Sequence, residues 1–147
     1  MRILVLLCLA IVQSNAMALP EAPKVKYDAT YSVCKAMVPV GHRDFSLVNG
    51  VGPSSPILGY FMSRGEAYDI KSWKKTLVES PKHGELILQP TGGYFYYANE
   101  GYLGPDQLTW VVEAQGKKFK VIETVWVANT APEYGGCPDD YKLPPAE

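Results

Sequence analysis

The chain has few of the side chains from which catalytic sites are usually built. It carries two histidines, His42 and His83, and three cysteines in 147 residues, without a C-x-x-C unit or a G-x-S-x-G segment. A nucleophile with its base, or a zinc site, needs such side chains at defined spacing. We therefore predict no catalytic residues, no metal and no cofactor, and a small secreted enzyme is the weakest of three functional classes.

Long runs of like charge are also missing, and only one long apolar run is present. Fourteen basic and 15 acidic residues nearly cancel, so nucleic acid is not an expected partner. The apolar run covers residues 3–12 and follows a short basic start. This layout is typical of a secretory signal peptide and is too short for a transmembrane segment. Residues 1–18 are predicted to be cleaved, after Ala16 or Ala18, and the mature protein to be secreted or periplasmic.

Two cysteines, Cys34 and Cys137, remain after that cleavage. An even pair in an exported chain most often forms a disulfide bond. Neither residue has a histidine within four positions, which argues against zinc. We predict a Cys34–Cys137 disulfide that ties the Pro- and Gly-rich tail, residues 129–147, to a domain spanning residues 19–128. Two free thiols are the alternative.

Turn residues divide the domain into short segments, which predicts an all-β fold. Twelve prolines and 13 glycines leave little room for helices of ordinary length. The clearest strand spans residues 107–114, where apolar and polar residues alternate. This alternation predicts that Leu108, Trp110 and Val112 are buried and that Gln107, Thr109 and Glu113 are exposed.

Other segments give weaker signals. Strands are predicted at residues 30–38, 44–48, 57–62, 94–97 and 117–128, with a turn at Gln115-Gly116 and a hairpin that joins residues 77–78 to 85–88. Near Glu123 the apolar parity shifts, which indicates a bulge or a strand buried on both faces. Residues 66–79 keep a helix open as an alternative, because their apolar residues fall near one helical face.

The carboxyl half carries a motif that resembles a known family. The chain reads S-P-K-H-G-E-L from Ser80 and Y-F-Y-Y-A-N-E-G-Y-L-G-P-D-Q-L-T-W from Tyr94. Residues 76–128 thereby resemble the cadherin-like, immunoglobulin-type repeats of bacterial surface proteins, whose pattern is P-x-H-G followed by Y-x-P-N-x-G-Y-x-G-x-D-x-F-x-Y. The match departs at Ala98, where the family prefers proline, and at Leu108 and Trp110, where one large apolar residue replaces another. The resemblance implies an immunoglobulin-like or cadherin-like β-sandwich and a role in adhesion or surface interaction.

Calcium often lies between repeats of that family, but it is not expected here. Calcium takes about six to eight oxygen ligands, and the nearest acidic pairs, Glu100 with Asp106 and Asp139 with Asp140, supply too few. We expect Asp106 to accept hydrogen bonds from loop amides instead. His83 is interpreted as a turn residue rather than a general base.

Aromatic residues favour a role in recognition. Ten of the 17 aromatic residues are tyrosines, which combine an apolar ring with a polar tip. The family pattern directs Tyr94 and Tyr96 inward, and Phe95 and Tyr97 outward. Phe95 and Tyr97 beside Trp126 would form a flat binding patch, unless they only pair across strands.

From these features we expect a non-catalytic exported module that binds a protein partner. A carbohydrate-binding module that uses the same aromatic residues is the alternative.

Overall fold

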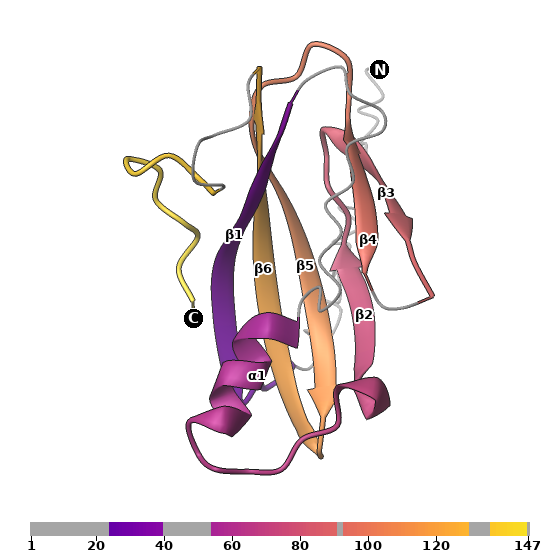
Figure 1. Cartoon of the computed structure of the whole chain (residues 1–147), viewed down its shortest axis with the longest axis vertical. Helices are drawn as coiled ribbons and strands as arrows, with labels where there is room; N and C mark the ends of the chain where they lie inside the picture. Colours follow the sequence, from indigo (N-terminus) through magenta and orange to yellow (C-terminus); the bar gives the residue numbers. More distant parts are fainter. Residues whose placement is uncertain (1–23, 40–53, 91–92, 130–135, 147) are drawn as a thin grey trace, which may run out of the picture.

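Strands make up most of the regular structure. The computed structural model describes residues 24–39, 54–90, 93–129 and 136–146. In these residues the elements are β1 (Ala29–Pro39), α1 (Ser55–Met62), the 3-10 helix η2 (Ile70–Ser72), β2 (Lys74–Glu79), β3 (Gly84–Leu88), β4 (Tyr94–Ala98), β5 (Gly104–Ala114) and β6 (Lys117–Ala128) (Figure 1). The predicted predominance of β-structure is confirmed. The predicted signal peptide, His42 and the strand at 44–48 lie outside the described residues.

Four strands form one sheet in the order β1-β6-β5-β2, and β3 pairs with β4 in a second sheet. The predicted turn at Gln115 and Gly116 joins β5 to β6, and both residues have positive φ, 51° and 75°, as a tight two-residue hairpin requires. β1 runs parallel to β6. The first and last strands of the described chain therefore lie side by side (Figure 1).

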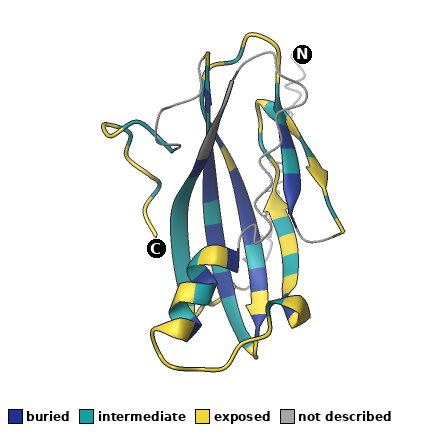
Figure 2. Cartoon of the chain, in the orientation of Figure 1, coloured by how far each residue is buried: buried dark blue, intermediate teal, exposed yellow. Residues whose placement is uncertain are grey.

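The core covers one face of the four-stranded sheet. Alternate residues of β5 and β6 point to this face, and Tyr94 and Tyr96 of β4 join the same buried cluster. Tyr94 stacks against Trp110 with ring centroids 5.8 Å apart. Phe61 of α1 packs edge-on against Phe119 at 6.0 Å. The β3–β4 sheet and α1 thus cover different parts of one sheet face, and buried positions gather on β4, β5 and β6 (Figure 2).

The predicted strand at residues 57–62 is wrong, because this segment is part of helix α1. Pro56 lies in the first turn, where its fixed φ suits a helix start and its missing N–H is not needed. Ile57 and Phe61, four residues apart, meet on one helical face, and both are fully buried. The apolar pattern fitted a strand and a buried helix equally well.

The alternative of a helix at residues 66–79 is also wrong over most of its length. Only η2 is helical there, and Asp69 begins it by accepting a hydrogen bond from the Lys71 N–H at 3.1 Å. Trp73 is buried and Leu77 is half-buried. A separation of four residues places two side chains on one face of a strand as well as of a helix, so the spacing could not distinguish the two.

The predicted hairpin between residues 77–78 and 85–88 does not form. β2 pairs with β5, with Leu77 opposite Trp110, whereas β3 pairs with β4, with Leu86 opposite Tyr96. The turn at residues 80–84 therefore leads from one sheet to the other.

Burial along β5 follows the predicted alternation except at Thr109. Leu108, Trp110 and Val112 are buried as predicted, and Gln107 and Glu113 are exposed. Thr109 was expected to be exposed but is buried, and its hydroxyl donates to Glu79 Oε2 of the neighbouring strand β2 at 2.6 Å.

A buried carboxylate interrupts the apolar pattern of β6. Every second residue from Phe119 to Val127 is buried in the core, and Glu123 occupies one of these positions at 0% exposure. The β5–β6 register is continuous, so no bulge interrupts that pairing. Thr124, on the opposite face, is also fully buried. Burial on both faces, one of the two predicted explanations, is therefore confirmed at this position.

No helix in the described ranges is long and apolar enough to cross a membrane.

Candidate interaction surface

The outward side of the β3–β4 sheet presents an apolar and aromatic surface. Because Tyr94 and Tyr96 are buried, strand alternation sends Phe95 and Tyr97 to the other side, where both are half-buried. Ile87 lies opposite Phe95, and Glu85 lies opposite Tyr97. Ile87 is 46% exposed. We call these four residues, Glu85, Ile87, Phe95 and Tyr97, the hairpin face.

A hollow of about 360 Å³ opens at the Tyr97 end of the hairpin face. It is lined by Glu85, Ile87, Tyr97, Ala98, Asn99 and Glu100. The lining combines an aromatic ring and an aliphatic side chain with two carboxylates and an amide. Such a surface can bury apolar atoms of a ligand and accept hydrogen bonds from it.

Two buried hydrogen bonds fix the hairpin face to the rest of the protein. Tyr94 donates to Glu123 Oε2 at 2.8 Å, and Tyr96 donates to Asp106 Oδ2 at 2.9 Å. Burial, together with these carboxylates, raises the pKa of each phenol far above its ordinary value. Both tyrosines therefore stay protonated and act as anchors for β4.

Asp106 organises the corner beside β4. Its carboxylate is buried and accepts hydrogen bonds from the N–H groups of Lys82, His83 and Gln107 at 2.8–2.9 Å, in addition to the Tyr96 hydroxyl. The predicted role of Asp106 as an acceptor for loop amides is confirmed.

The residues around this corner are held by packing. The His83 ring stacks on Tyr102 with centroids 4.0 Å apart. Tyr102 lies in a loop where Gly101 and Gly104 have positive φ, 76° and 115°, which favours glycine. His83 is thus a turn residue with a stacked ring, as the sequence indicated.

Trp126 lies on a different face from the other two predicted patch residues. Its neighbours Val125 and Val127 are buried in the core, so alternation places Trp126 on the opposite face of the four-stranded sheet. Phe95 and Tyr97 lie beyond the core on the far side of β4. The structure therefore does not bring Trp126 together with Phe95 and Tyr97, and the predicted three-residue patch is divided.

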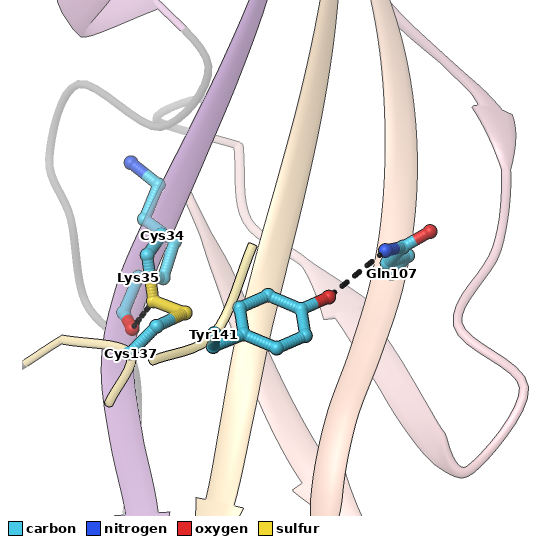
Figure 3. The surroundings of a disulfide bond; sticks show 5 residues. All are labelled: Cys34, Lys35, Gln107, Cys137 and Tyr141. Atoms are coloured by element: carbon cyan, nitrogen blue, oxygen red, sulfur yellow. Dashed lines mark hydrogen bonds between the residues drawn. A yellow bond between two sulfur atoms is a disulfide. The ribbon is translucent and has the colours of Figure 1, made fainter. Parts of the chain in front are cut away.

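The tail covers Trp126. The Tyr141 ring packs edge-on against it with centroids 5.2 Å apart, and the Tyr141 hydroxyl accepts a hydrogen bond from Gln107 Nε2 at 3.2 Å (Figure 3). Residues 136–146 form neither helix nor strand, as predicted for this part of the tail. The tail thus lies against the outer face of β5 and β6 through side-chain contacts.

A disulfide bond anchors this tail. Cys34 and Cys137 are joined, with an S–S distance of 2.01 Å and α-carbons 5.8 Å apart (Figure 3). The predicted pairing is confirmed. Cys34 lies beside Thr124 in the β1–β6 register, so the bond holds the tail next to the strand that carries Trp126.

A second buried polar cluster was not predicted from the sequence. Lys35 Nζ lies 3.1 Å from Glu123 Oε1, and the two side chains are 8% and 0% exposed. Trp110 Nε1 donates to Glu123 Oε2 at 2.9 Å, the same oxygen that accepts from Tyr94. The parity shift at Glu123 was the available signal, but neither of its two predicted explanations, a bulge or a strand buried on both faces, included a buried charge.

In the described part of the chain, no group of three or more His, Cys, Asp or Glu residues is placed to hold a metal ion. Both oxygens of Asp106 already accept protein hydrogen bonds.

Comparison with protein-family models, curated proteins and solved structures returned no match. We therefore infer the function from the surfaces of the chain itself.

Proposed function

We propose that the chain is a non-catalytic, exported interaction module whose hairpin face binds a partner protein at the cell envelope or outside the cell. The observation that carries this proposal is the outward-facing surface formed by exposed Ile87 and by the half-buried rings of Phe95 and Tyr97. Aromatic side chains are enriched at protein interfaces, because they bury much area and lose little conformational entropy.

The rigidity of the hairpin face supports the same proposal. Tyr94 and Tyr96 alternate with Phe95 and Tyr97 along β4. The hydroxyl groups of Tyr94 and Tyr96 donate hydrogen bonds to the buried carboxylates of Glu123 and Asp106. A binding surface that is already ordered in the free protein loses less entropy when it binds. The hydrogen bonds of Tyr94 and Tyr96 on one side of β4 therefore keep the hairpin face on the other side ordered before a partner binds.

The fold expected from the motif is consistent with an interaction module. We propose an immunoglobulin-like or cadherin-like sandwich for residues 19–128, supported by the parallel pairing of β1 with β6 and by the β3–β4 sheet that lies across the core. Export is supported by the signal-like layout of residues 1–18 and by the disulfide bond.

A glycan is the second candidate ligand, and the hollow favours it. Glu85, Asn99 and Glu100 could bind sugar hydroxyls while the Tyr97 ring stacks on a sugar face. A protein partner instead needs the wider surface that includes Phe95 and Ile87. The two ligand classes thus make different demands on the same side of the sheet.

Site-specific photo-crosslinking tests the proposal. A photoreactive phenylalanine analogue at position 95 should capture one discrete protein from the exported fraction of the native source, and Tyr97→Ala in the same chain should abolish capture. The same analogue at Glu113, an exposed residue outside the hairpin face, is the matched control.

Three results would contradict a protein partner at this face. They are capture at position 113 but not at 95, no capture at position 95, and binding to a glycan array that depends on Tyr97 without any crosslinked protein. The last result would favour the carbohydrate-binding alternative.

A further inference from the structure

An amine and a carboxyl group meet in the interior of the protein. Lys35 Nζ lies 3.1 Å from Glu123 Oε1, and both side chains are more than nine-tenths buried. In the parallel β1–β6 ladder, Glu123 lies opposite Val33 and Lys35 opposite Val125. The lysine therefore reaches diagonally along the core face, from the first described strand to the last.

The two oxygens of Glu123 have different surroundings. Oε2 accepts hydrogen bonds from the Tyr94 hydroxyl at 2.8 Å and from Trp110 Nε1 at 2.9 Å, whereas Oε1 faces the Lys35 amine. Two fixed donors at one oxygen stabilise the negative charge that develops there when a nucleophile attacks a carboxyl carbon. The arrangement therefore distinguishes a retained oxygen, Oε2, from a leaving oxygen, Oε1.

Burial also favours removal of the two charges. An ion pair in the interior has lost its hydration, and the attraction between its charges often fails to offset that loss. An amide at the same place is neutral, and its carbonyl oxygen can keep the hydrogen bonds from Tyr94 and Trp110. The attacking nitrogen is already close to the carboxyl group, so the entropic cost of bringing the reactants together is met by folding.

We propose that Lys35 and Glu123 condense within the folded protein to form an amide bond that joins β1 covalently to β6. Proton transfer from Nζ to Oε1 gives an amine and a carboxylic acid, and Nζ then attacks Cδ. The Nζ–Cδ bond forms and the Cδ–Oε1 bond breaks. Of the three ammonium hydrogens, one stays on nitrogen and two leave with Oε1 as water. No electrons are transferred, and no co-reactant is needed.

Mass spectrometry of the mature protein tests the proposal directly. After reduction and alkylation, which remove the contribution of the disulfide, the intact mass should be lower by one water molecule than the mass of the mature sequence with both cysteines alkylated. A mass equal to that of the fully alkylated sequence, with no water missing, would overturn the proposal. This test is independent of the partner-binding function, because it requires no ligand.

Tryptic digestion locates the bond. A modified Lys35 is not cleaved, so residues 27–43 should stay joined to residues 121–142. Cys34 and Cys137 lie in these same two peptides, and for that reason the disulfide must be reduced first. A link between Lys35 and any carboxyl group other than that of Glu123 would overturn the assignment.

Two variants test the chemistry. Lys35→Arg keeps a cation beside Glu123 but removes the primary amine, so its mass should equal that of its sequence. Tyr94→Phe removes one of the two donors to Oε2, so a smaller fraction of the protein should be linked at equal age. An unchanged fraction in Tyr94→Phe, or loss of water in Lys35→Arg, would contradict the mechanism.

Discussion

Tyr141 packs edge-on against Trp126 at 5.2 Å, although the two residues lie in different parts of the molecule, a tail without regular structure and a central strand. The disulfide between Cys34 and Cys137 brings them together, because it fixes the tail four residues before Tyr141. The disulfide at Cys34 of β1 thus places the Tyr141 ring over Trp126 of the neighbouring strand β6.

Removal of the disulfide should release the tail. In a Cys34→Ser, Cys137→Ser variant, we expect acrylamide to quench tryptophan fluorescence more strongly, because Trp73 and Trp110 are buried and Trp126 loses its cover. Tyr141→Ala should give part of this effect, and Lys142→Ala, an exposed neighbour, should give none. Unchanged quenching in the double variant would show that other contacts hold the tail.

The same variant should also be less stable. The bond closes a loop with a sequence separation of 103, for which chain entropy predicts a loss of up to about 4.7 kcal/mol. An amide between Lys35 and Glu123 closes an overlapping loop, so the loss should be smaller in the wild-type background than in Lys35→Arg. Urea unfolding measures the loss of stability on removing the disulfide from the wild type and from Lys35→Arg, which requires four proteins in all. Equal losses in the two backgrounds would show that the amide does not close an overlapping loop.

Trp110→Ala should be severely destabilising. The side chain is 3% exposed and donates to buried Glu123, so truncation leaves a cavity and should cost roughly 3–5 kcal/mol. Trp126→Ala, at a half-buried position on the other face, should cost less. Urea midpoints of the two variants measure the difference, and the reverse order would be incompatible with the core described above.

Asp106→Asn should loosen the corner that carries β4. An amide cannot accept all the hydrogen bonds that the carboxylate accepts from three backbone N–H groups and Tyr96. An unsatisfied buried group costs about 1–3 kcal/mol, and amide hydrogen exchange at residues 82, 83 and 107 should accelerate. Asp139→Asn, at an exposed position, is the control. Unaltered exchange in Asp106→Asn would contradict this role.

Stability should fall at alkaline pH. Burial raises the pKa of Tyr94 and Tyr96 above the ordinary value of 10.0, and Glu123 and Asp106 raise it further. Below about pH 10 both phenols are protonated in the folded and unfolded states, and their stabilising effect is complete. Above that pH the unfolded chain loses these protons first, so the free energy of unfolding decreases. Tyr96→Phe should make the decrease less steep. A free energy of unfolding that does not change above about pH 10 would contradict this coupling.

Residues with strict local patterns could be predicted from the sequence. β5 alternates cleanly and was predicted with its buried residues, and Gln115-Gly116 identified its turn. Alternation along residues 94–97 indicated that one pair of aromatic residues is buried, and the resemblance to the family pattern identified that pair as Tyr94 and Tyr96. In each case the local chemistry and the tertiary environment favour the same conformation.

Elsewhere the outcome depended on partners distant in the sequence. Thr109 is buried and hydrogen-bonded to Glu79, which is 30 residues away, and Trp126 is covered by Tyr141, which a disulfide holds in place. The shifted parity in β6 was visible, but its cause, a carboxylate that faces Lys35, requires β1 to lie beside β6. Local periodicity contains no information about such pairings.

The position of the disulfide also has a mechanical consequence. If the two ends of the protein were pulled apart, tension entering through the amino-terminal segment would pass at Cys34 directly across the sulfur–sulfur bond to Cys137. Nearly all of the core, including β5, β6 and the hairpin face, lies in the covalent loop between these residues and would carry no load. Only the segments before residue 34 and after residue 137 could lengthen. A surface held in this way would keep its shape while the protein bears force between two attachment points.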